Sequence, residues 1–230
     1  MRSHPVIGVL SGCGGGGASV LAAVIAAAAA RREGASLLID CDQFGGGIDV
    51  LLGCEQVAGP RWRDVRLRGG ELDPTVLLDS LPQWQGVSFL AAASAEELNP
   101  DDVSQVIGSA TAAAVAVVDL PRWPSAVRAS AIQRCDLVVL VTVAEVRAVT
   151  AAGLIAAGLD AGQTVVAVRG RSRTLPSRRI GDLLGLPIIG EISYEPASLR
   201  PDGLDLRRTR RATQQLADVV LDRCASTVAA

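Results

Sequence analysis

The chain has 230 residues, of which 49% are hydrophobic, and its net charge is −2. The near-neutral charge gives no sign of a nucleic-acid partner, and five cysteines without a C-x-x-C pair argue against a disulfide framework or a zinc site. All 22 basic residues are arginines, which excludes any mechanism that needs a lysine ammonium group.

Short apolar runs alternate along the chain with longer segments rich in Ala and Leu, a pattern typical of parallel strands joined by helices. The predicted strands are Val6–Leu10, Ser36–Ile39, Val87–Leu90, Ala114–Val118, Leu137–Thr142, Thr164–Val168 and Ile188–Ile192. The predicted helices are Ser19–Arg32, Asp101–Ala112, Ser125–Arg134, Glu145–Leu159, Ser177–Leu184 and Leu206–Cys224. Right-handed crossovers would make an α/β fold with a doubly wound, mostly parallel seven-stranded sheet and helices on both faces.

The rest of the pattern adds no second core, so we expect residues 1–230 to form one domain. The segment Gly59–Gln85 contains three prolines and two tryptophans, and we expect short helices at the edge of the sheet there. No signal-peptide pattern is present, and the apolar run Val20–Ala30 is shorter than the roughly 20 residues that span a bilayer. These features predict a cytoplasmic protein.

A run of glycines follows the first predicted strand and leads into the first helix, in the sequence SGCGGGGAS (Ser11–Ser19). Glycines let a backbone approach phosphate oxygens, and the unpaired N–H groups at a helix N-terminus attract anions. Ser19 occupies the position from which a hydroxyl can bind Mg²⁺. The loop therefore predicts a phosphate site, with a simple tight turn as the alternative.

Acidic residues close two of the predicted strands. Asp40 and Asp42 follow the second strand in LLIDCDQFGG, and Asp119 follows the fourth in AVAVVDLPR. The carboxyl ends of parallel strands meet at one edge, so these carboxylates should lie near the loop. Asp42 and Asp49 have capping of the next turn as their alternative role.

These motifs together resemble the MinD/ParA class of P-loop ATPases. SGCGGGGAS is similar to the deviant Walker A motif of that class, LLIDCDQFGG to its second acidic motif, and VVDLPR to its Walker B strand. The likeness continues to LGLPIIGEISYEPA (Leu184–Ala197). Within the class, GGELDPTVLLDSLPQWQGVSFLAA (Gly69–Ala92) and the loop's ending in G-A-S are most similar to the CpaE/TadZ-like branch, which includes actinobacterial septum-site-determining proteins.

The resemblance implies a role for each matching residue. The phosphate-binding positions are Gly12, Cys13, Gly14, Gly15, Gly16, Gly17, Ala18 and Ser19, and the base-proximal ones are Arg169, Tyr194 and Pro196. Ser19, Asp40 and Asp119 would hold Mg²⁺ and its water shell, and Asp42 would be the catalytic carboxylate that positions the attacking water. ATP or ADP with Mg²⁺ is the implied cofactor.

The departures from the family pattern are as informative as the matches. Cys13 stands where the family has its signature lysine, Ala18 where it has the lysine that bridges the phosphates, and Val168 where it has an asparagine. The resemblance thus implies a degenerate P-loop ATPase-like domain that binds nucleotide weakly and hydrolyses it very slowly or not at all. Two alternatives stay open: a nucleotide-free interaction scaffold, and a slow ATPase in which Arg122, Arg128 or Arg147 replaces the lysines.

The implied cellular role is that of a spatial organiser, in septum-site determination or in the localisation of a Flp-type pilus or secretion assembly. Its partners would be a second copy bound through the phosphate-loop face and a pilus, secretion or division-site protein; nucleic acid is an unlikely partner. The last predicted helix begins with RRTRR (Arg207–Arg211) and carries an apolar stripe of Leu216, Val219, Val220 and Cys224. We expect this stripe to pack against the sheet, with peripheral contact at the inner face of the plasma membrane as the alternative.

Overall fold

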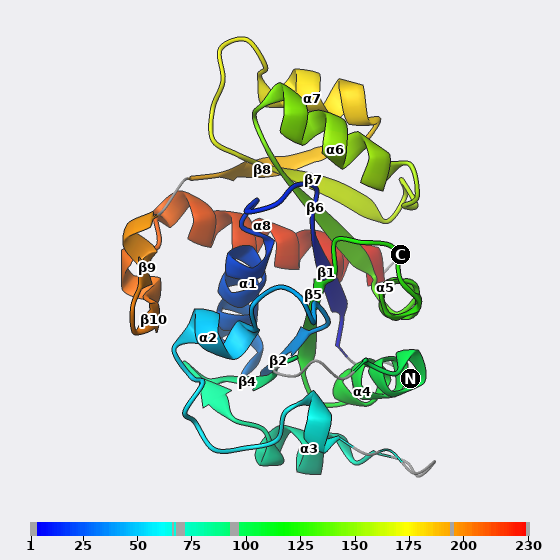
Figure 1. Cartoon of the computed structure of the whole chain (residues 1–230), viewed down its shortest axis with the longest axis vertical. Helices are drawn as coiled ribbons and strands as arrows, with labels where there is room; N and C mark the ends of the chain where they lie inside the picture. Colours follow the sequence, from blue (N-terminus) through cyan, green and yellow to red (C-terminus); the bar gives the residue numbers. More distant parts are fainter. Residues whose placement is uncertain (1–3, 66, 68–71, 93–96, 194–195, 229–230) are drawn as a thin grey trace.

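The computed structural model describes residues 4–65, 67, 72–92, 97–193 and 196–228, and Figure 1 shows their course. The strands are β1 (Val6–Ser11), β2 (Ser36–Asp40), β3 (Gln83–Trp84), β4 (Val87–Leu90), β5 (Val115–Leu120), β6 (Leu137–Val143), β7 (Thr164–Arg169), β8 (Ile188–Ile192), β9 (Leu199–Arg200) and β10 (Gly203–Leu204). The α-helices are α1 (Ala18–Glu33), α2 (Ile48–Leu52), α3 (Pro74–Ser80), α4 (Pro100–Ala110), α5 (Ala126–Ile132), α6 (Val146–Ala156), α7 (Ser177–Leu184) and α8 (Arg211–Val228). Short 3-10 helices lie at Trp62–Asp64, Pro196–Ser198 and Leu206–Arg208.

Strands β1 to β8 form one eight-stranded sheet in the order β3-β4-β2-β5-β1-β6-β7-β8. Its pairings are parallel except that of β3 with β4, which is antiparallel. The expected number of seven strands was therefore wrong, because it left out the edge strand β3. That strand has two residues and is joined to β4 through Gln85 and Gly86, which both have positive φ, as in a two-residue hairpin.

Each face of the sheet is covered by helices, and alternate strand residues enter one of two apolar cores. Ile7 and Val9 of β1 belong to the core that includes α1 and α8, whereas Val6 and Leu10 belong to the core that includes α4, α5 and α7. Figure 1 shows α1 on one side of the strands and α4 and α5 on the other. Strands buried on both faces read as continuous apolar runs, which is why the sequence predicts them so well.

Helix α1 is buried over most of its circumference because it lies under both the sheet and α8. All residues from Leu21 to Ala29 are buried, and the alanines let the neighbouring elements approach closely. Leu216, Val220 and Cys224 of α8 are also buried, so these residues of the predicted apolar stripe pack in the core, whereas Val219 is 46% exposed and does not. Within the described residues, no helix has the length and apolar character needed to cross a bilayer.

The segment between β2 and β4 differs most from expectation. It contains α3 and the 3-10 helix Trp62–Asp64, as expected for Gly59–Gln85, but α2 follows directly after the glycines of Gly45–Gly47. A five-residue helix is too short to give a clear period in the sequence. It nevertheless contacts α1.

Candidate functional site

The loop between β1 and α1 is held by its own backbone. The Gly12 N–H donates to the carbonyl of Val141 on β6 at 2.7 Å, and the Ser11 hydroxyl donates to the Cys13 carbonyl at 2.5 Å. Helix α1 then begins after Gly17, a left-handed residue whose position provides no side-chain cap. The N–H groups of the first turn are thus left for another acceptor, which is the arrangement that binds anions.

Two glycines of the loop are required for different reasons. Gly15 has φ +65°, and a Cβ there would meet nothing within 4 Å, so this residue faces open space. A Cβ on Gly16 would lie 2.6 Å from the Ser11 hydroxyl oxygen, so this residue is fixed by packing. The loop is therefore closely packed at Gly16, on the side of Ser11, and open to solvent at Gly15.

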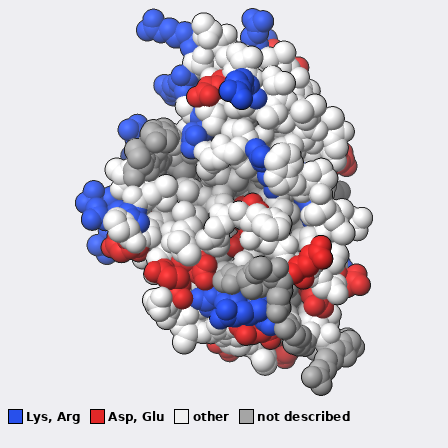
Figure 2. Space-filling view, viewed as in Figure 1, with Lys and Arg blue, Asp and Glu red and all other residues white. Residues whose placement is uncertain are grey.

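The open side of the loop forms the floor of a cleft of about 530 Å³. Its lining includes Ser11, Cys13–Val20, Asp40, Asp42, Phe44, Ile48, Asp119, Arg122, Trp123, Arg169 and Leu199. Figure 2 shows the centre of this face hollowed, with acidic side chains inside the hollow and basic side chains beside it. The cleft lies at the carboxyl ends of the central strands, where open α/β sheets bind ligands.

Two buried carboxyl groups face each other at the base of the cleft. Asp40 of β2 and Asp119 of β5 are register partners, with 2% and 5% of their surface exposed. Burial raises the pKa of Asp40 to about 6, even though the N–H groups of Asp42, Ile48 and Ala92 donate to it. The pKa of Asp119 is also raised, first by burial and next by the charge of Asp40. A hydrogen bond from the Ser19 hydroxyl to the Asp119 carboxylate opposes this rise. A cation at this point would relieve the repulsion between the two carboxylates.

Asp42 also lines the cleft and, unlike this pair, is only half-buried. Its carboxylate accepts a hydrogen bond from the Phe44 N–H at 3.3 Å, so it also shapes the turn that follows β2. Burial raises its pKa, while this hydrogen bond and the nearby Arg122 charge lower it. The carboxylate is thus available to a ligand in the cleft, although it also has the capping role considered as its alternative.

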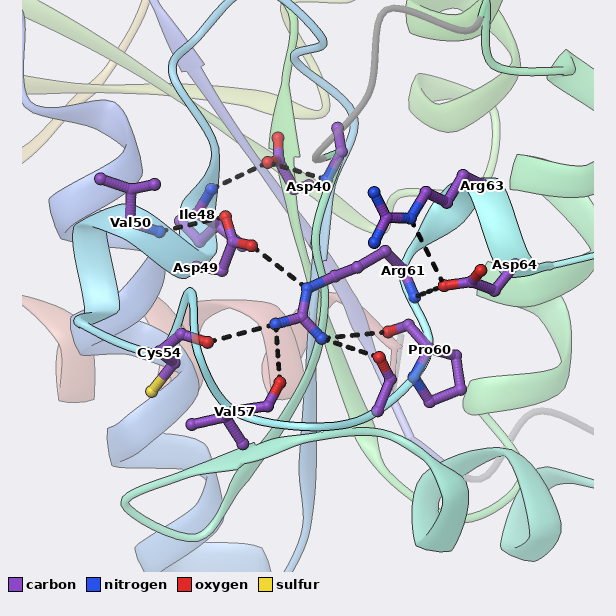
Figure 3. A network of polar contacts seen from close by, with 12 residues as sticks. Asp40, Ile48, Asp49, Val50, Cys54, Val57, Pro60, Arg61, Arg63 and Asp64 are labelled. Carbon is purple, nitrogen blue, oxygen red and sulfur yellow. Dashed lines mark hydrogen bonds and ion pairs between the residues drawn. The ribbon is translucent and has the colours of Figure 1, made fainter.

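A buried ion pair supports the acidic base of the cleft from below (Figure 3). The Arg61 Nε donates to Asp49 Oδ2 at 3.1 Å, and its other nitrogens donate to the carbonyls of Cys54, Val57, Gly59 and Pro60. The next residue, Trp62, donates from its indole N–H to the Asp40 carbonyl at 2.7 Å. The segment 54–62 is thereby fixed to both α2 and the end of β2.

Sequence reasoning missed this network, because Asp49 was considered only as a capping residue. A buried arginine twelve residues from its carboxylate has no local spacing that could reveal the contact. Trp62 and Trp84 are buried, whereas Trp123 is 66% exposed. Trp123 instead stacks with Arg122, whose guanidinium carbon lies 4.1 Å from the ring centre.

Two arginines lie beside the glycine loop. The Arg122 Nη1 is 3.8 Å from the point where a Cβ on Gly14 would lie. The Arg169 Nη1 is 3.7 Å from the point where a Cβ on Gly17 would lie. Arg128 is buried and donates to the Arg122 carbonyl at 2.6 Å, so it supports the loop without lining the cleft. Arg147 is exposed on α6 and does not line the cleft either.

The donor set fits Mg²⁺ bound together with a phosphate ligand. Among the residues that the structure describes, no group of three or more His, Cys, Asp or Glu side chains forms a metal cluster. Mg²⁺ in nucleotide sites usually keeps several waters and uses one or two carboxylates plus phosphate oxygens. Ser19, Asp40 and Asp119 can supply that partial shell, whereas a closed protein cage is not present in the described part.

The structure brings together nearly all the residues singled out in the sequence. Cys13 to Ser19, Asp40, Asp42, Asp119 and Arg169 line one cleft, and Gly12 lies just beneath it against Ala152. Tyr194 lies outside the described residues, and of Pro196 only the backbone, at the start of a 3-10 helix, is described. Phe44, which is 91% exposed at the cleft, was not singled out, since a lone aromatic among loop glycines gives no signal.

Comparison with known proteins extends these observations. No family model matches the chain. An uncharacterized protein of Mycobacterium tuberculosis strain H37Rv is 37% identical over 181 residues, which cover 75% of this chain and 52% of that protein, and its counterpart in strain CDC 1551 matches equally. The chain thus spans about half the length of the curated relatives it matches.

Solved structures match almost the whole chain. A ParA family ATPase from Chlorobium tepidum has a TM-score of 0.78 at 19% identity, with 96% of this chain and 98% of that chain covered. MinD in a MinC:MinD complex from Aquifex aeolicus has a TM-score of 0.75 at 22% identity, with 96% of each chain covered. MinD from Pyrococcus horikoshii, complexed with Mg-ADP, has a TM-score of 0.74 at 19% identity, with 97% and 98% covered. The chain has the fold of the MinD/ParA P-loop ATPases.

At these identities the MinD/ParA likeness concerns the fold alone. It agrees with the expected α/β architecture and with the position of the cleft at the carboxyl ends of the strands. The chemistry of the cleft still has to be argued from this chain's own residues, because the loop carries neither of the lysines that the family motif contains.

Proposed function

We propose that this protein is a degenerate nucleotide-binding spatial organiser that holds Mg-ATP or Mg-ADP in the Gly12–Ser19 cleft. The observation that carries the proposal is the open cleft above an uncapped helix N-terminus, with two buried carboxylates at its base. The backbone N–H groups would bind phosphate oxygens, and Ser19, Asp40 and Asp119 would hold the metal and its waters.

The missing lysines set the expected strength of binding. A charge-assisted hydrogen bond contributes about 1.5–3 kcal/mol, so losing one lowers affinity by roughly 10- to 150-fold. The helix N-terminus, the glycine backbone and the metal remain. Since two lysines are missing, at Cys13 and Ala18, we expect Mg-ATP and Mg-ADP to bind at least that much more weakly than they bind a lysine-bearing loop.

Hydrolysis should be affected more than binding. Phosphoryl transfer is accelerated mainly by positioned positive charge, and the loop itself offers none on its side chains. Asp42 is the residue we assign to positioning the attacking water, because it matches the carboxylate with that role in the motif it resembles and lines the cleft. Turnover is expected to be very slow, so nucleotide would act mainly as a structural ligand.

The cellular role is proposed from the resemblance to the CpaE/TadZ-like branch and from the fold. Among the compared structures, the MinD proteins are described as cell division proteins, and one of them is in a complex with MinC. Another is described as a ParA family ATPase. We propose that this chain acts in the cytoplasm and recruits a division-site protein or a pilus or secretion assembly. Phe44 and Trp123, exposed at the cleft, support a homodimer that closes over the nucleotide.

Isothermal titration with Mg-ATP and Mg-ADP tests the proposal. Gly15→Asp places a carboxylate in the cleft at φ +65°, and Gly185→Asp is its matched control, because Gly185 has φ +64°, caps α7 and also faces open space. We expect binding to the unmodified protein and to Gly185→Asp, and none to Gly15→Asp. No heat from the unmodified protein at millimolar nucleotide would overturn the proposal in favour of a nucleotide-free scaffold.

A second candidate function is a slow ATPase with arginine compensation, and the positions of Arg122 and Arg169 beside the loop favour it. Its expected signature is phosphate release above background that disappears in Asp42→Ala. A flat time course for the unmodified protein would exclude it without affecting nucleotide binding.

A further inference from the structure

The structure leaves a cleft rich in carboxylates and backbone N–H groups, with two guanidinium groups at its walls. We propose that Arg122 and Arg169 form an arginine clamp that binds the phosphates of a nucleoside di- or triphosphate in place of the missing lysines. This inference rests on the proposed function, since it names the groups that would hold the same ligand. It differs from the resemblance, which places Arg169 near the base.

The two arginines approach the loop from opposite directions. Arg122 follows β5 and Arg169 ends β7, and in the sheet these strands lie on opposite sides of β1. The Gly12–Ser19 loop follows β1, so it lies between them. The Arg122 Nη1 lies 3.8 Å from where a Cβ on Gly14 would be, and the Arg169 Nη1 lies 3.7 Å from where a Cβ on Gly17 would be. Both arginines therefore line the cleft beside the loop, one near each end of its glycine run.

Arg122 is held in place by neighbours that leave its charge uncompensated. Its guanidinium stacks on the Trp123 ring, and the Arg128 side chain fixes its carbonyl. In the described ranges no carboxylate forms an ion pair with Arg122, although Asp42 is near enough to feel its charge. The nitrogens therefore stay available for hydrogen bonds to a ligand in the cleft.

Arg169 lies at the N-terminal end of α1. Its carbonyl accepts the Ala144 N–H at 3.0 Å, and its Cδ and Nη1 run within 3.8 Å of the Cβ position of Gly17. A cation beside a helix N-terminus is unfavourable, because that end of the helix carries partial positive charge. An anion bound between them would be attracted both by the N-terminus of α1 and by the Arg169 guanidinium group, and it would offset the repulsion between the two.

Arginine suits this ligand better than a single point charge would. Its planar fork can donate two parallel hydrogen bonds to phosphate oxygens, and it remains charged at every physiological pH. Two such forks at the sides of the loop would hold a chain of phosphates from its flanks. The ammonium groups of the family loop would be replaced from the neighbouring loops and not from within the loop itself.

The experiment compares binding of Mg-ADP and of inorganic tripolyphosphate by titration calorimetry. The variants are Arg122→Met and Arg169→Met, with Arg147→Met on exposed α6 as the matched control, and thermal denaturation checks that each is folded. We expect each cleft variant to bind both ligands about 10- to 150-fold more weakly, and Arg147→Met to bind them as the unmodified protein does. Arg122→Lys and Arg169→Lys should recover part of the loss.

The outcomes separate the clamp from the function on which it rests. If the unmodified protein binds Mg-ADP and both Met variants bind it equally well, the clamp is wrong and the proposed function stands. If Arg169→Met weakens Mg-ADP but leaves tripolyphosphate unchanged, Arg169 holds the nucleoside and the clamp is also wrong. If the unmodified protein binds neither ligand, the clamp fails together with the proposed function.

Discussion

Asp40 and Asp119 are register partners on neighbouring parallel strands, and both carboxyl groups are almost fully buried. Burial raises both pKa values, that of Asp40 to about 6. In the unfolded chain an aspartate titrates near pH 4. The folded protein therefore binds both protons more tightly than the unfolded chain does. For Asp40, the contribution to stability is complete below about pH 4 and is lost as the pH rises through about 6.

Asp119→Asn should consequently stabilise the ligand-free protein. Removing one of the two charges relieves the repulsion, and the Ser19 hydroxyl keeps an acceptor. We expect the free energy of unfolding at pH 7.5 to rise by on the order of 1–2 kcal/mol, with little change at pH 4. Urea denaturation at both pH values measures this, and exposed Asp182→Asn is the control. An unchanged or lower midpoint at pH 7.5 would contradict the account of the pair.

Arg61→Met should be strongly destabilising, because it leaves Asp49 buried without its cation and four carbonyls without their donors. Breaking a buried pair in this way costs about 3–5 kcal/mol. Arg63→Met is the matched control, because Arg63 is exposed and forms only a long ion pair of 3.9 Å with Asp64. We expect it to change the free energy of unfolding by no more than about 0.5 kcal/mol. Equal urea midpoints for the two variants would show that the network in Figure 3 contributes little.

Gly16→Ala should disturb the loop through the Ser11 hydroxyl, which lies 2.6 Å from the added methyl position. We expect a loss of about 1–3 kcal/mol in unfolding free energy, typical of an overpacked site. Ser11→Ala in the same chain removes the colliding oxygen and should restore part of it. Gly14→Ala, with no atom closer than 3.8 Å, should be tolerated. A stable Gly16→Ala protein would mean that the loop adjusts freely.

Phe44→Ser and Trp123→Ser should leave folding intact but prevent a nucleotide-dependent dimer. Both side chains are largely exposed at the cleft, and large exposed apolar groups there are best explained by a partner surface. Sedimentation velocity with and without Mg-ATP measures the dimer. Leu154→Ser, at an equally exposed position on α6, is the control. Dimers that persist in both cleft variants would exclude this face.

The sequence predicted the seven longer strands of the sheet to within two residues at each end, because strands buried on both faces form continuous apolar runs. It also predicted the loop and the aspartates of the cleft, since these follow strands directly. It did not predict the contact of Arg61 with Asp49 or that of Arg169 with Gly17. Such contacts depend on how distant segments fold together, and no local pattern records them.

The burial of α8 against α1 has a consequence for how the chain can be handled. Helix α8 packs against alanine-rich α1. A protein shortened before Arg211 would leave that flank of α1 bare to solvent. We expect such fragments to aggregate during expression, because an apolar helix face would be exposed.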